Sequence, residues 1–89
     1  MAKTKKATKS KEKSIITNQS FEFLKNYLNN PSPVGFESGG QKIWLEYITP
    51  FVDTTFHDPY GTAVGVINPD APFKVVIEAH ADEISWFVN

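Results

Sequence analysis

The hydrophobic and polar positions of the sequence predict a helix in its first half. Its apolar and aromatic positions recur at helical spacing or lie beside that stripe: Phe21, Phe23, Leu24, Tyr27 and Leu28. We expect this helix to begin near Thr17 or Asn18, because either side-chain oxygen can cap it. Glu22 would then lie in the first turn, where the helix dipole favours an anion. Pro31 is expected to end the helix.

The next segments predict a loop and a second helix. Residues 31–37, with the sequence PSPVGFE, form a loop by composition, since the two prolines restrict the backbone. A second helix is expected from Glu37 or Ser38 to Thr49, and Pro50 should end it. Its apolar face comprises Ile43, Trp44, Tyr47 and Ile48. We interpret both helices as packing elements without a chemical role.

After the second helix, short β-branched runs alternate with turn residues. Residues 51–57 predict a strand that ends in a tight turn with the sequence DPYG. Residues 63–67 and 73–79 predict two further strands, and we expect them to pair as an antiparallel hairpin across the turn sequence NPDAP. Residues 84–88 form a last apolar run. Two helices followed by a β-hairpin and a partial sheet indicate an α/β fold.

Composition narrows the class of protein. At 89 residues the chain is one domain or part of one. A hydrophobic content of 40% favours a folded, soluble unit, and no apolar run approaches the roughly 20 residues needed to span a bilayer. Cys is absent, so a transition-metal site would have to use His, Asp and Glu as ligands. The same absence is compatible with a cytoplasmic location.

Charge divides the chain into a basic extension and an acidic remainder. Residues 1–13 carry six Lys and one Glu, whereas residues 14–89 carry three Lys and nine acidic residues. We interpret residues 1–14 as a disordered, solvated extension, with an electrostatic tether to a polyanion as the alternative. Arg is absent throughout, which argues against nucleic-acid binding, because Arg is the usual reader of bases.

The candidate chemistry lies where the 73–79 run ends. His80, Asp82 and Glu83 follow that run, and the first two share one face of an extended segment because they are two residues apart. Either both bind a metal, or His80 binds through one ring nitrogen while Asp82 accepts a hydrogen bond from the other. From these residues alone, a His that hydrogen-bonds its neighbour at a strand end is the simpler interpretation. His57 is a further candidate, but its DPYG context indicates a turn first.

Four motifs in a fixed order make the pattern more specific. They are PSPVGFE at 31–37, the second helix and its exit at 44–50, DPYG at 58–61, and VVIEAHADEI at 75–84. This set resembles the start of the dinuclear metallo-aminopeptidases of the glutamyl-aminopeptidase and tetrahedral (TET) type, over residues 21–88. The sequence departs from that family's usual pattern at three positions, none of them a metal-binding group: Thr62 for Asn, Ala81 for Met and Ser85 for Gly.

The resemblance implies a zinc-peptidase fold of the phosphorylase/hydrolase-like kind, with residues 15–89 as the first segment of a split catalytic domain. Two divalent metal ions, Zn²⁺ or Co²⁺, would activate a water, and a Glu would act as the general base. His80 matches a metal ligand. Asp82 matches the aspartate of the H-x-D motif, a catalytic-site residue that lies behind the ligand and supports it. The remaining ligands and the general base would lie beyond Asn89.

The same resemblance implies the partners. Substrates would be peptides with a free N-terminus, and the whole protein would be a homo-oligomer that binds neither nucleic acid nor membrane. Residues 1–89 alone would be inactive. Two alternatives stay open: a related H-x-D metallohydrolase, such as a deacylase or dipeptidase, and a non-catalytic α/β interaction module that folds alone.

Overall fold

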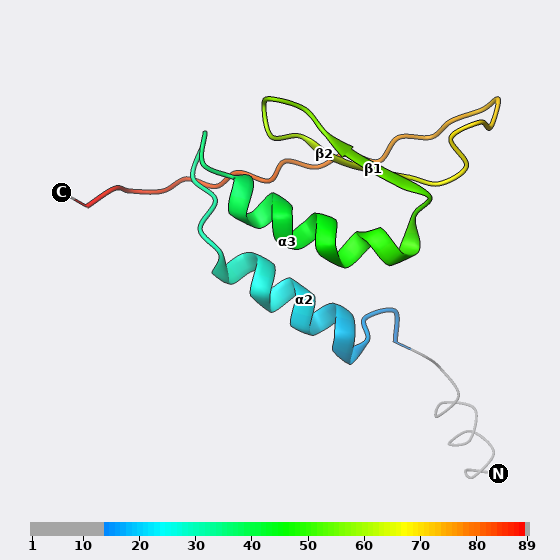
Figure 1. Cartoon of the computed structure of the whole chain (residues 1–89). Coiled ribbons are helices and arrows are strands. Elements are labelled where there is room, and N and C mark those ends of the chain that lie inside the picture. The colour runs from blue at the N-terminus through cyan, green and yellow to red at the C-terminus, as the bar shows by residue number, and fades with distance from the viewer. Residues whose placement is uncertain (1–13, 89) are drawn as a thin grey trace, which may run out of the picture.

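A computed structural model describes residues 14–88 and places two helices against a small sheet (Figure 1). The elements are helices α2 (Asn18–Asn29) and α3 (Ser38–Ile48), the 3₁₀ turn η1 (Thr49–Phe51), and strands β1 (Thr54–His57) and β2 (Ala63–Val66). Helix α3 lies between α2 on one side and the two strands on the other (Figure 1). The basic extension predicted for residues 1–14 lies outside the described residues, apart from Ser14.

Helix α2 begins where its capping residues predict. The Thr17 hydroxyl accepts a hydrogen bond from the Ser20 N–H at 3.0 Å, and the Ser20 hydroxyl accepts one from the Thr17 N–H at 2.8 Å. This reciprocal capping box satisfies two donors that the helix leaves free. The placement predicted for Glu22 was wrong, since the first turn holds no acidic residue. Glu22 instead pairs with Lys25 one turn on, at 3.2 Å and exposed to solvent.

Helix α2 packs through a different face from the stripe that its spacing predicts. Phe23 stacks on Tyr47 of α3, with ring centroids 4.1 Å apart and planes inclined by 14°. The stripe of Phe21, Leu24 and Leu28 stays exposed to solvent. The inward face is therefore aromatic and only half-buried.

Helix α3 is held against the preceding loop by a small residue. It begins at Ser38 as predicted, and Gly40 in its first turn is buried. A Cβ at Gly40 would lie 2.8 Å from the Oγ of Ser32, so the loop at 31–37 approaches the helix closely only because a glycine stands there. Pro50 ends the α-helix, and the chain continues through η1 for one further turn.

The two strands form an antiparallel hairpin in the register Thr54↔Val66 to His57↔Ala63. The predicted DPYG turn is confirmed, with the Gly61 N–H donating to the Asp58 carbonyl at 3.0 Å. Gly61 has φ of 91°, a conformation that other residues resist.

The predicted pairing of residues 63–67 with 73–79 was wrong. Strand β2 pairs with β1 instead, and neither 73–79 nor 84–88 forms a strand within the described part of the chain. Only five residues separate β1 from β2, so this pairing closes a short loop that already contains a favourable turn. Residues 72–88 run instead as an extended trace across the molecule (Figure 1).

The described residues make a small α/β unit with a thin interior. No hydrophobic side chain among residues 14–88 is buried, and the buried polar residue is Ser32 at 5% exposure. The radius of gyration is 18.2 Å, whereas a compact domain of 100 residues has about 13 Å. None of the helices in this part of the chain is long and apolar enough to cross a bilayer.

Candidate functional site

His80 and Asp82 form a hydrogen-bonded pair on the extended segment. The Nδ1 of His80 lies 3.2 Å from the Oδ1 of Asp82 and 3.0 Å from its backbone carbonyl oxygen. Their spacing of two residues on extended backbone places both side chains on the same side, as the sequence predicts. The side chain of His80 is 86% exposed and that of Asp82 is 39% exposed.

The geometry of this pair favours one tautomer of the imidazole ring. Both atoms near Nδ1 are oxygens that accept hydrogen bonds, so Nδ1 carries the proton and donates it. In the neutral ring, Nε2 is then unprotonated and has a free lone pair. This is the arrangement in which a carboxylate orients a histidine that ligates a metal through its other nitrogen.

Glu83 attaches the His80 segment to the loop at 31–37. The Glu83 N–H donates to the Ser32 carbonyl at 2.9 Å, and the Glu83 Oε1 accepts from the Ser32 N–H at 3.3 Å. A parallel bridge between Pro33 and Glu83 accompanies these bonds. Two motifs that are 51 residues apart therefore meet. Sequence reasoning named Glu83 only as a neighbour of the pair, and its position directly after Asp82 did not reveal this contact.

The described residues do not assemble a metal site by themselves. Among residues 14–88, no three His, Asp or Glu side chains lie close enough together to hold a metal ion. A catalytic zinc site uses about three protein ligands. The donor set around His80 therefore fits one ligand position with its orienting carboxylate.

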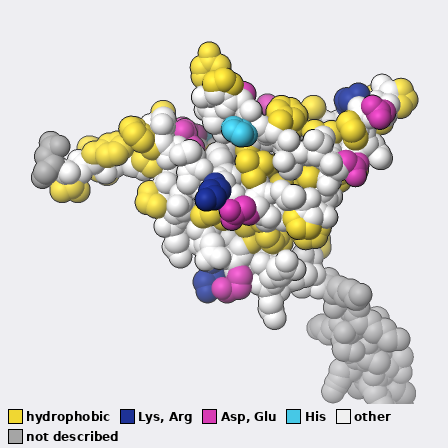
Figure 2. All heavy atoms as spheres, viewed as in Figure 1, with side chains coloured by type: hydrophobic (Ala, Val, Ile, Leu, Met, Phe, Trp, Pro, Cys, Tyr) yellow, Lys and Arg dark blue, Asp and Glu magenta, His cyan; other side chains and the backbone are white. Residues whose placement is uncertain are grey.

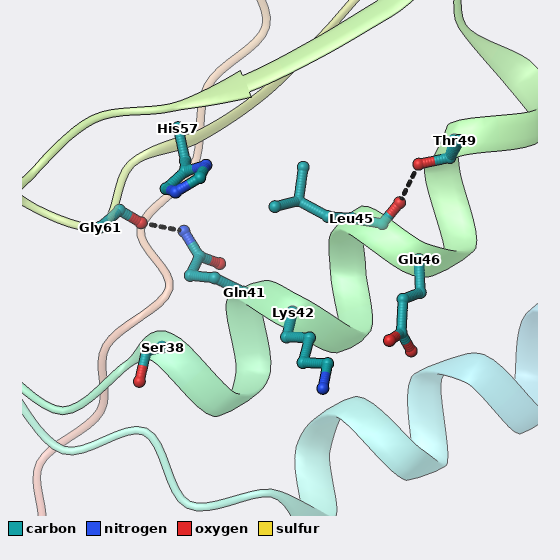
Figure 3. A pocket seen from close by; sticks show the side chains of 8 residues that line it. All are labelled: Ser38, Gln41, Lys42, Leu45, Glu46, Thr49, His57 and Gly61. Carbon is teal, nitrogen blue, oxygen red and sulfur yellow. Dashed lines mark hydrogen bonds between the residues drawn. The ribbon is translucent and has the colours of Figure 1, made fainter.

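His57 lies in a different place, over a cleft between the hairpin and α3. The cleft has a volume of about 380 Å³, and its lining residues are Ser38, Gln41, Lys42, Leu45, Glu46, Thr49, His57 and Gly61 (Figure 3). Gln41 crosses it, donating from Nε2 to the Gly61 carbonyl at 2.7 Å. Lys42 and Glu46 point away from His57 (Figure 3). The polar side chains of the cleft thus do not point toward one common position. We interpret the cleft as the packing boundary between the hairpin and α3.

The turn that follows His57 in the sequence contains Asp58, a carboxyl group with a lowered pKa. The Asp58 Oδ1 accepts hydrogen bonds from the Tyr60 and Thr62 N–H groups, each at 2.9 Å. The Thr62 N–H is the largest cause that lowers the pKa of the Asp58 carboxyl below its ordinary value, and the Tyr60 N–H adds to it. Asp58 therefore acts as a structural acceptor that holds the turn.

Comparison with known proteins adds no functional information. No family model matches the sequence, and neither a curated protein nor a solved structure matches it. The functional argument therefore rests on the geometry of His80 and the residues around it.

Proposed function

We propose that this chain contributes the first metal ligand, His80, to a dinuclear metallo-aminopeptidase. The observation that carries the proposal is the His80–Asp82 pair, which leaves Nε2 free for a metal while the carboxylate fixes the ring. His80 would hold the metal, and Asp82 would keep the ring in its binding tautomer. The bound metals would polarise the scissile carbonyl and lower the pKa of a water.

The contact between two of the family-like motifs supports the same proposal. Residues 31–37 and the HADE sequence at 80–83 lie far apart in the chain, yet Ser32 and Glu83 exchange hydrogen bonds. Such a contact fixes the backbone immediately after His80 and Asp82. A ligand beside a restrained backbone loses less conformational freedom on binding a metal than one in a free chain. The proposed protein works in the cytoplasm as a homo-oligomer and acts on peptides with a free N-terminus. The other metal ligands would come from residues of the same protein beyond Asn89.

The test compares two histidines in the intact protein that carries these residues. His80→Ala should abolish the release of N-terminal residues that depends on Zn²⁺ or Co²⁺, because a metal ligand is lost. His57→Ala is the matched control and should keep that activity. Asp82→Asn should weaken metal binding by roughly 10- to 100-fold, as loss of an orienting partner does. Undiminished activity in His80→Ala would refute the assignment.

The choice of substrates separates the aminopeptidase from its nearest alternative. A panel of amino-acid amides and N-acyl amino acids should show turnover only of substrates with a free amino group. Turnover confined to N-acyl substrates would instead identify an H-x-D deacylase. Isothermal titration measures metal binding directly, without any substrate. His80→Ala should weaken that binding whichever class of substrate the enzyme cleaves.

A further inference from the structure

The segment at residues 73–79 has the character of a strand without a partner. Among residues 14–88, no backbone–backbone hydrogen bond involves residues 72–82. The apolar side chains of the segment are exposed, including Val75 at 76%, Val76 at 81% and Ile77 at 94%. Unpaired backbone groups beside exposed β-branched residues are the features by which one strand pairs with another.

The two faces of this segment differ in character. One face of the extended segment carries Phe73, Val75 and Ile77. The opposite face carries Val76 between Lys74 and Glu78. Figure 2 shows how much hydrophobic surface the molecule presents to solvent. The segment thus has an apolar face to bury and a face with one charge of each sign.

We propose that residues 73–79 pair with the same residues of a second copy of this chain, as an antiparallel two-stranded interface centred on Val76. Two-fold symmetry about Val76 places Lys74 of each copy opposite Glu78 of the other, so two ion pairs form. It also places Val75 opposite Ile77 twice, which gives β-branched pairs on the apolar face. The segment is therefore complementary to itself in charge and in shape.

Other registers lack this complementarity. A shift by two residues moves Lys74 opposite Val76 or His80 and leaves Glu78 without a cation. A parallel, in-register pair would place Lys74 opposite Lys74 and Glu78 opposite Glu78, and like charges directly opposite are destabilising. Pro72 lacks an N–H and limits the pairing at the segment's start. In the single chain Lys74 donates to the Ala71 carbonyl at 2.9 Å, a local contact that the pair would replace.

The experiment measures dimerisation of the 89-residue chain by sedimentation velocity over a concentration series. The wild-type chain should associate to a dimer as concentration rises. Lys74→Glu and Glu78→Lys should each raise the dimer dissociation constant by roughly two- to thirtyfold, because each places like charges opposite twice. The double charge swap should restore the wild-type value. Lys42→Glu, which makes the same charge change on the exposed face of α3, should leave it unchanged.

A backbone variant tests the pairing independently of charge. Successive N–H groups of a strand point to opposite edges, so the double variant Val75→Pro with Val76→Pro removes an N–H that faces the partner in either pairing pattern and should abolish the dimer. Its circular dichroism should match wild type, since Val75 and Val76 are exposed and outside every helix and strand. A chain that stays monomeric, or a dimer that the double proline variant or Lys74→Glu leaves intact, overturns the proposal. Metal binding through His80 is measured separately, so the two proposals fail independently.

Discussion

At the scale of residues, short polar side chains determine local geometry. Thr17 and Ser20 cap α2 reciprocally, and Asp58 gathers the N–H groups of Tyr60 and Thr62 into a turn. Asp82 orients a side chain in a similar way, because its Oδ1 accepts a hydrogen bond from the ring of His80. In each case an oxygen acceptor lies two to four residues from its donor. These contacts are local, so sequence spacing alone indicates them.

The lowered pKa of Asp58 predicts a pH-dependent turn. A depressed folded-state pKa contributes stability above the unfolded pKa of about 3.9, and that stability is lost as pH falls through the folded value. The Asp58 carboxyl should therefore titrate at lower pH in the native chain than in urea, as followed by carbon NMR. Equal midpoints would contradict the bonding to Thr62. Asp58→Asn should have a lower free energy of unfolding than wild type near neutral pH. The two free energies should converge in acid, where the Asp58 carboxyl is protonated.

At the scale of elements, helix ends and turns agree with the sequence, whereas strand pairing does not. Caps and prolines act on neighbouring residues, so α2, α3 and the DPYG turn are predictable from the chain near them. Residues 73–79 have good strand composition, but composition does not choose between two possible partners for β2. The closer strand, β1, pairs with it. The His80–Asp82 contact is local and was foreseen, whereas the Ser32–Glu83 contact joins distant segments and was not.

The close approach of α3 to its preceding loop predicts that a larger residue at position 40 lowers the stability of the chain. Gly40→Ala adds a Cβ that would lie 2.8 Å from the Ser32 Oγ. At this distance the Ser32 side chain or the helix has to shift. Overpacking of this kind costs about 1–3 kcal/mol, and the better helix propensity of Ala returns up to about 1 kcal/mol. We expect a net loss of stability in urea unfolding followed by circular dichroism. Adding Ser32→Ala removes the obstructing oxygen, and the double variant should recover; no recovery would place the strain elsewhere.

At the scale of the whole molecule, secondary structure is present with little enclosed interior. Helix α3 contacts both α2 and β2, yet its aromatic and aliphatic residues are only half-buried. Large hydrophobic residues remain exposed on α2, on the 31–37 loop and along 73–88. These exposed surfaces can therefore bury apolar area by contact with another protein surface, such as the second copy proposed above.

The extended course of residues 72–88 predicts the order in which trypsin cuts after Lys25, Lys42 and Lys74. Proteases bind an extended chain, and Lys74 lies in one without backbone hydrogen bonds to other described residues. Lys25 and Lys42 are instead held in helices. Brief trypsin digestion at low protein concentration should therefore cut after Lys74 before it cuts after either of those. Mass spectrometry identifies the products, and Lys74→Ala should abolish those of the cut after residue 74. Earlier cleavage at Lys42 would show that α3 is the less stable element.

The exposed hydrophobic surface also determines how stability responds to temperature. Unfolding usually raises the heat capacity by about 12–15 cal/mol/K per residue, because apolar groups become hydrated. Here the described residues bury no hydrophobic side chain, so much of that surface is already hydrated in the folded chain. We therefore expect a heat capacity change below this average, and a free energy of unfolding that curves less with temperature, as differential scanning calorimetry would measure. Burying the exposed surface against a second copy of the chain should restore the usual curvature without changing any helix or strand.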